Sequence, residues 1–259
     1  MAITLRSRRE IDLIRRAGSV VAGVLLKLKE LAVPGVTTAE LDEVALEMTA
    51  AAGAHALFKG VKNPYGHNPF PGAICASLNE QIVHGIPSAK CKLSDGDILS
   101  VDFGVKLDGY CGDAAVTIGV GQVSAENLRL IDVTKAVLEI ATSQAAPGAR
   151  WSQIAGKMQR YAEKAGFSVV KDFVGHGIGT EMHAEPSVPN FVSRSLRNND
   201  IYLAPGMVLA VEPMINAGSD GTKILKDGWT VATKDGKNSA HFEHTIVVTE
   251  EGCEVLTLQ

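Results

Sequence analysis

The chain repeats one plan of helices, and this repeat limits its fold more than any other feature. One predicted helix ends at Pro34-Gly35, and the next runs to Gly53. The same order returns 113 residues later at Pro147-Gly148 and Gly166. At this offset four apolar positions, Val20, Val24, Leu25 and Leu41, fall on Val133, Val137, Leu138 and Ile154. The repeat predicts two pseudo-symmetric halves, about residues 1–120 and 124–259.

The helices of each half can be placed from local signals. Apolar residues at helical spacing predict helices over residues 7–31 and 124–143. Thr37 followed by Glu40 is the pattern of a capping box, so another helix begins there, and its counterpart covers residues 151–166. The short link between the halves is no flexible linker, so we expect residues 1–259 to form a single domain.

An apolar hairpin with an aspartate in each arm is predicted for residues 96–120. Asp108-Gly109 suits a two-residue type I′ turn between two β-rich runs. That turn sets Gly104 opposite Asp113, which makes Asp102 the diagonal neighbour of Asp113, with Cβ atoms roughly 5–8 Å apart. Burying two like charges is costly unless one is protonated or a cation lies between them. A divalent cation is the more economical answer.

The second half repeats the acids as well as the helices. Asp102 and Glu212 each end a run that begins with a glycine six residues earlier. Asp113 is followed by a β-rich run, and Glu243 stands at the matching point of the second half. A pseudo-twofold packing of the halves would therefore bring four carboxylates to one centre, which requires metal.

Three histidines stand out by their context. His176 lies in Gly175-His176-Gly177-Ile178-Gly179, where glycines allow backbone or substrate to approach closely. His183 follows seven residues later, and His84 precedes Gly85. A single histidine is more often structural, but the combination with four paired acids favours a metal site.

Several motifs together resemble those of a known family. Residues 101–113 (VDFGVKLDGYCGD), 175–179 (GHGIG) with His183, 211–214 (VEPM) and 243–249 (EHTIVVT) resemble the ordered ligand motifs of type I methionine aminopeptidases. IVHGIP and KDGWTV match as well, and the similarity spans essentially the whole chain. It implies the α/β (α+β) pita-bread fold, which is a duplicated antiparallel sheet with helices packed on its outer face.

The resemblance also implies a ligand set for two divalent ions. Asp102 would hold one ion in bidentate fashion, Asp113 and Glu243 would bridge both, and His176 and Glu212 would complete the other. Four carboxylates and one imidazole suit Co²⁺, Mn²⁺ or Fe²⁺, and Zn²⁺ is also compatible.

By the same resemblance, the chain would remove the N-terminal methionine from nascent proteins through metal-activated hydroxide. Glu212 would be the general base, His183 would bind the scissile carbonyl oxygen, and His84 would contact the peptide nitrogen beyond the cleaved bond. The methionine pocket would have apolar walls from Cys75, Phe70 and Trp229. Cys75 is interpreted as a small buried residue rather than a nucleophile.

The loop over residues 58–71 departs from the family pattern. It is several residues longer than expected, and Val61 aligns with a pocket tyrosine. Tyr65 or His67 is a candidate replacement. Pocket shape, and the tolerance of the residue after methionine, stay open at this stage.

Two other functions are compatible with these motifs. One is an Xaa-Pro aminopeptidase or prolidase, but such enzymes usually carry a large N-terminal domain, whereas here the first helix starts near Ser7. The other is a non-catalytic pita-bread binding protein, although such proteins usually lose ligands. Comparing the cleavage of Met-peptides with that of Xaa-Pro peptides would separate a methionine aminopeptidase from an Xaa-Pro hydrolase. An absence of both bound metal and hydrolysis would favour the binding protein.

Composition bounds the partners and the compartment. A formal charge of −4 argues against non-specific nucleic-acid binding. No apolar run approaches the ~20 residues of a membrane span, and the N-terminus lacks the pattern of a secretory signal, so we expect cytoplasmic residence. For the oligomeric state, a monomer is the default expectation. An N-terminal basic cluster has two interpretations, a ribosome contact or a solvated helix face; its members are Arg6, Arg8, Arg9, Arg15 and Arg16.

Overall fold

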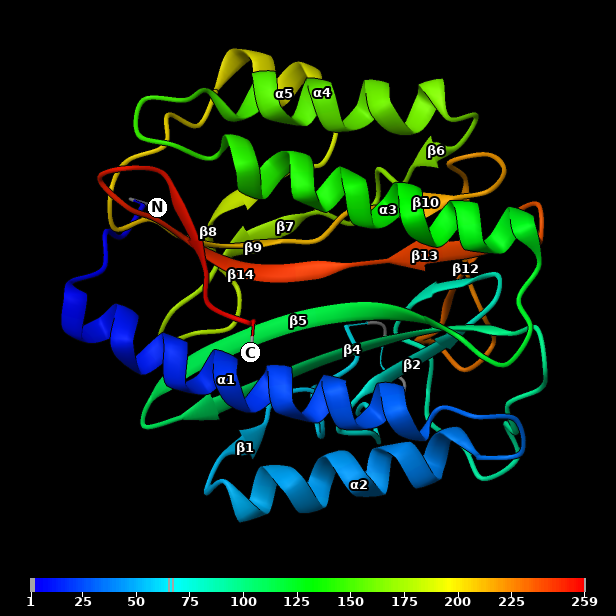
Figure 1. Cartoon of the computed structure of the whole chain (residues 1–259). Coiled ribbons are helices and arrows are strands. Elements are labelled where there is room, and N and C mark those ends of the chain that lie inside the picture. Colours follow the sequence, from blue (N-terminus) through cyan, green and yellow to red (C-terminus); the bar gives the residue numbers. More distant parts are fainter. Residues whose placement is uncertain (1–2, 65, 67, 259) are drawn as a thin grey trace.

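The computed structural model describes residues 3–64, 66 and 68–258 (Figure 1). Its helices are α1 (Arg8–Leu31), α2 (Thr38–Ala51), α3 (Ala125–Gln144), α4 (Trp151–Lys164) and α5 (Arg194–Asn198). Its strands are β1 (His55–Ala56), β2 (Cys75–Leu78), β3 (Gln81–Val83), β4 (Ile98–Leu107), β5 (Tyr110–Gly119), β6 (Ser168–Val169), β7 (Gly175–Gly177), β8 (Ala184–Val188), β9 (Val208–Val211), β10 (Met214–Asn216), β11 (Thr222–Ile224), β12 (Val231–Thr233), β13 (Ser239–His241), β14 (Glu243–Val248) and β15 (Cys253–Val255).

One antiparallel sheet runs through both parts of the chain. Within the described residues it has nine strands in the order β1-β4-β5-β14-β9-β7-β8, with β2 paired to β4 and β15 paired to β14. Two three-stranded sheets, β13-β10-β6 and β11-β12-β3, lie beside it. The pairing of β5 with β14 joins the first part of the chain to the last at the centre of the main sheet.

The long helices cover one face of this sheet, as Figure 1 shows. Helices α1 and α2 share an apolar core with β4 and β5, and α3 and α4 share another with β9 and β14. Along β4 the side chains that enter the helix-facing core are fully buried and alternate with Asp102 and Gly104; they are Leu99, Val101, Phe103 and Val105. Since successive strand residues point to opposite faces, Asp102 faces away from the helices. The predicted sheet with helices on its outer face is confirmed.

A similar backbone contact is made by each of the two glycines that follow a helix-breaking proline and stand 113 residues apart. Gly35 N–H donates to the Leu93 carbonyl at 2.8 Å, and Gly148 N–H donates to the Leu203 carbonyl at 2.8 Å. Both glycines have positive φ, +101° and +78°, so each breaks its helix pair with the same backbone shape. The division at about residues 120–124 stays a prediction, which these matched contacts support.

The central hairpin has the predicted register. Leu107 pairs with Tyr110 across the turn, and Gly104 pairs with Asp113. Asp108 and Gly109 have φ values of 50° and 85°, as a type I′ turn requires. The diagonal relation of Asp102 to Asp113 therefore follows as predicted.

Helix boundaries agree with the predictions to within a few residues. The predicted capping box forms, because Thr37 N–H donates to Glu40 Oε2 at 2.7 Å and Glu40 N–H donates to Thr37 Oγ1 at 3.3 Å. Helix α5 and strands β1, β6 to β8, β10 to β13 and β15 were not predicted, since most of them have only two or three residues, too few to show a periodic pattern. Among the helices of the described residues, none is both long and apolar enough to cross a membrane.

Candidate metal centre and active site

All the side chains predicted to form the site line one cavity of about 280 Å³. The candidate metal ligands in its wall are Asp102, Asp113, His176, Glu212 and Glu243. The candidate substrate contacts are Phe70, Cys75, His84, His183 and Trp229. These residues come from six separate stretches of sequence, and the sheet brings them together.

The acids converge because each lies on the face of the sheet away from the helices. In β5 the neighbours of Asp113 on the other face, Ala114 and Ile118, belong to the helix-facing core. In β14 the helix-facing residues are Ile246 and Val248, which leaves Glu243 on the cavity side. Because successive strand residues point to opposite faces of a sheet, the carboxylates of Asp113 and Glu243 both point into the cavity.

Distances define the closest part of the cluster. Ligand atoms of Asp113, His176 and Glu243 all lie within 4.8 Å of one another. His176 Nε2 is 3.6 Å from Glu212 Oε1 and 3.9 Å from Asp113 Oδ2. Asp102 borders the same cavity from β4.

Three of these acids each have one buried oxygen that no hydrogen bond satisfies in the described part of the chain. Buried oxygens Asp102 Oδ1, Asp113 Oδ1 and Glu243 Oε1 lack a hydrogen-bond partner among the described residues. Burial raises the pKa of Asp102 to about 7. Burial, together with repulsion from neighbouring acids, raises the pKa values of Asp113, Glu212 and Glu243 well above the ordinary range. Unpartnered oxygens around one point fit a divalent cation, whose charge would reverse these shifts.

The histidines of the site are held in their neutral form. Burial lowers the pKa of His176 and of His84 to about 4 each, and lowers that of His183. His176 Nδ1 lies 3.0 Å from the Gly177 carbonyl oxygen. With the proton on Nδ1, this bond leaves the Nε2 lone pair facing the acids, as a metal ligand requires.

The predicted pocket walls pack against one another beside the acids. Phe70 meets Trp229 edge to face with ring centroids 5.3 Å apart, and the His84 ring lies 6.3 Å from Trp229. Trp229 Nε1 donates to the Asn68 carbonyl oxygen at 2.8 Å, which fixes the indole. Burial and the charges of nearby acids raise the pKa of the Cys75 thiol well above its usual range, so the thiolate is disfavoured.

Several cavity residues were missed by the sequence analysis. They are Lys106, Cys111, Phe173, Glu181, Met182 and Met214. Met182 stands directly before His183, and Lys106, Cys111 and Met214 lie within the motifs quoted above, but no role in the cavity was predicted for any of the six. Val61 does line the cavity, whereas Tyr65 and His67 lie outside the described residues, so their predicted part in the pocket stays untested.

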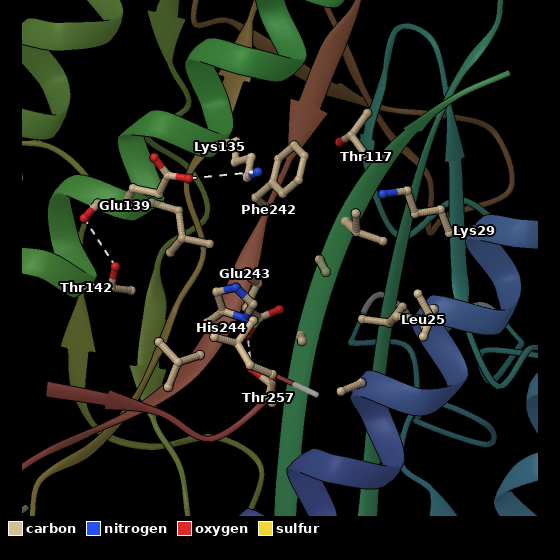
Figure 2. Close-up of a pocket in the computed structure, with 18 of the residues that line it drawn as sticks. Leu25, Lys29, Thr117, Lys135, Glu139, Thr142, Phe242, Glu243, His244 and Thr257 are labelled. Atoms are coloured by element: carbon tan, nitrogen blue, oxygen red, sulfur yellow. Dashed lines mark hydrogen bonds and ion pairs between the residues drawn. The ribbon is translucent and has the colours of Figure 1, made fainter. Parts of the chain in front are cut away.

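A larger hollow of about 690 Å³ lies on the opposite, helix-covered face. Figure 2 shows it between α1 and α3, with Leu25 and Lys29 on one side and Lys135 and Glu139 on the other. Of the candidate site residues only Glu243 borders it as well. The chemistry therefore belongs to the smaller cavity.

Comparison with known sequences agrees with this site. The model of metallopeptidase family M24 matches residues 12–250. Methionine aminopeptidase 1 of Bacillus subtilis is 46% identical over 255 residues, which are 98% of this chain and 99% of the relative. Methionine aminopeptidase of Escherichia coli K12 is 40% identical over 259 residues, which are 100% of this chain and 95% of the relative.

Solved structures give the same picture. A methionine aminopeptidase from Thermotoga maritima superimposes with a TM-score of 0.93 at 38% identity, covering 100% of both chains. A prolidase from Pyrococcus horikoshii reaches 0.76 at 20% identity and is covered over 63% of its length, so that likeness concerns the fold alone. From its matched family model, its relatives and its cluster of four acids and a histidine, the chain belongs to metallopeptidase family M24, among the methionine aminopeptidases.

Proposed function

We propose that this metallo-aminopeptidase removes the N-terminal methionine from nascent proteins. The observation that carries the proposal is the shared cavity, in which the acids and His176 lie beside an apolar pocket of Phe70, Cys75 and Trp229. Such a pocket can hold a thioether side chain while the acids lie close to the first peptide bond.

The residues present fit two divalent ions. Asp113, His176 and Glu243, whose ligand atoms lie within 4.8 Å of one another, would hold one ion together with Glu212, and Asp102 would help to hold a second ion in the same cavity. The family is one of metallopeptidases, and the oxygen-rich donor set favours Co²⁺, Mn²⁺ or Fe²⁺, with Zn²⁺ also compatible. When bound, such ions lower the pKa of a shared water toward neutrality and polarise a scissile carbonyl.

The side chains of the chain itself supply the proton transfers and the orientation. Glu212 takes a proton from the attacking water and passes it to the leaving amine. His183, whose ring centroid is 4.4 Å from that of His176, donates to the carbonyl oxygen as charge develops there. His84 stands against Trp229 at the pocket and contacts the peptide nitrogen beyond the cleaved bond.

The two alternative functions are not favoured. Xaa-Pro hydrolases from Pyrococcus and Bacillus share the fold at 19–22% identity, whereas the methionine aminopeptidase of Clostridium perfringens is 47% identical. A non-catalytic binding protein is disfavoured because all the candidate ligands are present and converge.

The ion pairs of the N-terminal arginines favour a solvated helix face over a ribosome contact. Arg6 pairs with Glu10 at 3.3 Å, Arg16 pairs with Asp108 at 2.8 Å, and Arg15 pairs with Glu254 at 2.8 Å. Three of the cluster's five members therefore have partners within this chain, as a solvated helix face would. Cytoplasmic residence and a monomeric state remain expectations from the sequence.

The specificity can be tested by offering Mn²⁺-loaded protein two peptide series. We expect release of free methionine from Met-Gly and Met-Ala peptides and no cleavage of Xaa-Pro peptides. Asp113→Asn, which keeps the shape of the side chain, should abolish the release and serves as the control. Cleavage of the Xaa-Pro series alone would overturn the proposal.

A further inference from the structure

His241, at the end of β13, is a buried side chain that the proposed reaction does not use. It is 1% exposed, and neither of its ring nitrogens has a hydrogen-bond partner among the described residues. Its Nε2 lies 3.9 Å from Glu212 Oε2. A buried polar ring without a partner is costly, so its position calls for a function.

The backbone of His241 is fixed in a way that aims the ring. Its N–H donates to Thr117 Oγ1 at 2.8 Å, and the Thr117 hydroxyl lies 2.9 Å from its carbonyl oxygen. His241 on β13 also pairs with Met214 on β10, and Met214 lies two residues after Glu212 in the sequence. The ring is thus held against the segment that carries the proposed base.

The two oxygens of Glu212 face different neighbours. Oε1 lies 3.6 Å from His176 Nε2, among the proposed ligands, and Oε2 lies 3.9 Å from His241 Nε2. Asn190 Nδ2 donates to the Glu212 carbonyl oxygen at 3.0 Å, which fixes the backbone of Glu212. The carboxylate has one oxygen toward the cluster and one toward His241.

We propose that His241 is a positioning residue for Glu212, donating from Nε2–H to Oε2, directly or through one water, so that Oε1 stays directed at the metal position. The inference deepens the proposed function and rests on it. Carboxylates that bind metals are commonly held by such outer hydrogen bonds, and losing one typically costs 10–100-fold in metal affinity or activity.

The test is to titrate the protein with Mn²⁺ in a calorimeter after its metal has been removed with a chelator. We expect His241→Leu to weaken Mn²⁺ binding by about 10–100-fold. His241→Gln keeps a side-chain N–H donor and should restore binding close to the native affinity. In steady-state assays with a Met-Ala peptide, His241→Leu should lower kcat while KM stays near the native value.

Asn216→Leu provides a matched control from the same small sheet. Asn216 is fully buried and has an unpartnered oxygen among the described residues, but its amide donates to the Ser219 carbonyl oxygen rather than facing an acid. We expect this variant to lower Tm and to leave Mn²⁺ affinity native.

Three results would overturn the inference while leaving the proposed function intact. They are native Mn²⁺ affinity in His241→Leu, Mn²⁺ binding by His241→Gln as weak as that by His241→Leu, and an equal loss of Mn²⁺ affinity in Asn216→Leu. A wild-type protein that binds no Mn²⁺ would overturn the proposed function with it.

Discussion

At the scale of single residues, the site depends on side chains whose chemistry is set by burial. The same removal from water that raises the pKa values of the acids lowers those of His84, His176 and His183. Neutral imidazoles can serve as ligand or donor at neutral pH, and the crowded acids are left for metal.

His183→Ala should reduce turnover while leaving metal content unchanged. A preorganised donor to a developing oxyanion contributes about 3–4 kcal/mol, so we expect kcat to fall by about 10²–10³-fold. Stopped assays with a Met-Ala peptide and metal analysis of the same sample give both quantities. A parallel loss of metal would instead make His183 a ligand.

Cys75→Ala should keep most of the activity. The thiol is 4% exposed, and the raised pKa disfavours the nucleophilic thiolate. We expect a higher KM, because the pocket loses a wall atom, with a nearly native kcat. Complete inactivation of a folded Cys75→Ala protein would restore the thiol to the mechanism.

Residue identities in the site could be predicted to different degrees. The four candidate acids could be found because each follows a strand or glycine pattern that recurs in the other half, as for Asp113 and Glu243, and His176 could be found because glycines flank it. Met182 and Phe173 could not, since an apolar residue near a cavity has no distinguishing pattern. His241 escaped notice because only its unpartnered ring, seen in three dimensions, marks it.

At the scale of elements, the helices of the two halves start differently. Helix α2 is capped by its own Thr37, whereas the N-cap residue of α4, Arg150, forms no side-chain cap within the described chain. The cap of α4 comes instead from Asp200, which follows α5. The Asp200 carboxylate accepts hydrogen bonds from Ser152 N–H at 2.9 Å and from Arg150 Nε at 2.9 Å. A local pattern could predict the first cap, but a cap supplied from 48 residues away has no sequence signature.

Asp200→Ala should lower the free energy of unfolding by about 1–2 kcal/mol at pH 7, the usual cost of losing a helix cap. Although burial opposes it, hydrogen bonds from Ser152 and Arg150 lower the pKa of Asp200. A lowered folded-state pKa means that this stabilisation is present above about pH 4 and is lost as pH falls below it. Urea unfolding at pH 7 and pH 3 should show a gap that closes in acid.

The exposed pair of Lys171 and Asp220 gives the control. Asp220→Ala should change the unfolding free energy by less than about 1 kcal/mol, as is usual for surface ion pairs. A pH-independent gap for Asp200→Ala would show that its carboxylate charge is not what stabilises α4.

At the scale of the whole molecule, the fold brings Asp102 and Asp113 into one cavity with Glu212 and Glu243, which lie much later in the chain. The hairpin of β4 and β5 could be predicted down to its register, because the two-residue turn fixes it. The joining of β5 to β14 could be inferred only through the repeat, since no local signal pairs strands so far apart. The loop over residues 58–71 could not be predicted, because pocket shape depends on packing rather than on strand parity.

The acid cluster predicts opposite pH dependences for chelated and metal-loaded protein. Without metal, the raised carboxyl pKa values make the folded state keep protons that the unfolded state has lost. Below about pH 6.5 the lowered pKa values of the buried histidines, among them His84 and His176, oppose this effect, because the unfolded histidines then bind the protons. The stability of the metal-free protein should therefore fall as pH rises from about 6.5 through about 7, the folded-state pKa of Asp102. With excess Mn²⁺, deprotonated ligands bind more tightly, so the loaded protein should gain stability with rising pH.

Thermal unfolding in EDTA and in Mn²⁺ between pH 5 and pH 8 checks these pH dependences. The Tm with Mn²⁺ should exceed the Tm with EDTA by an amount that grows with pH. Parallel curves in the two conditions would contradict a shared metal centre made by these acids.

The central claim, that acids from both halves form a metal centre that releases N-terminal methionine, can be tested in one titration. Chelated protein is mixed with a Met-Ala peptide, and free methionine is measured as Mn²⁺ is added. We predict no release before Mn²⁺ is added, a rise with added ion to a plateau, and no rise in Glu243→Gln. Full release by the chelated protein, or none at saturating metal, would contradict the account.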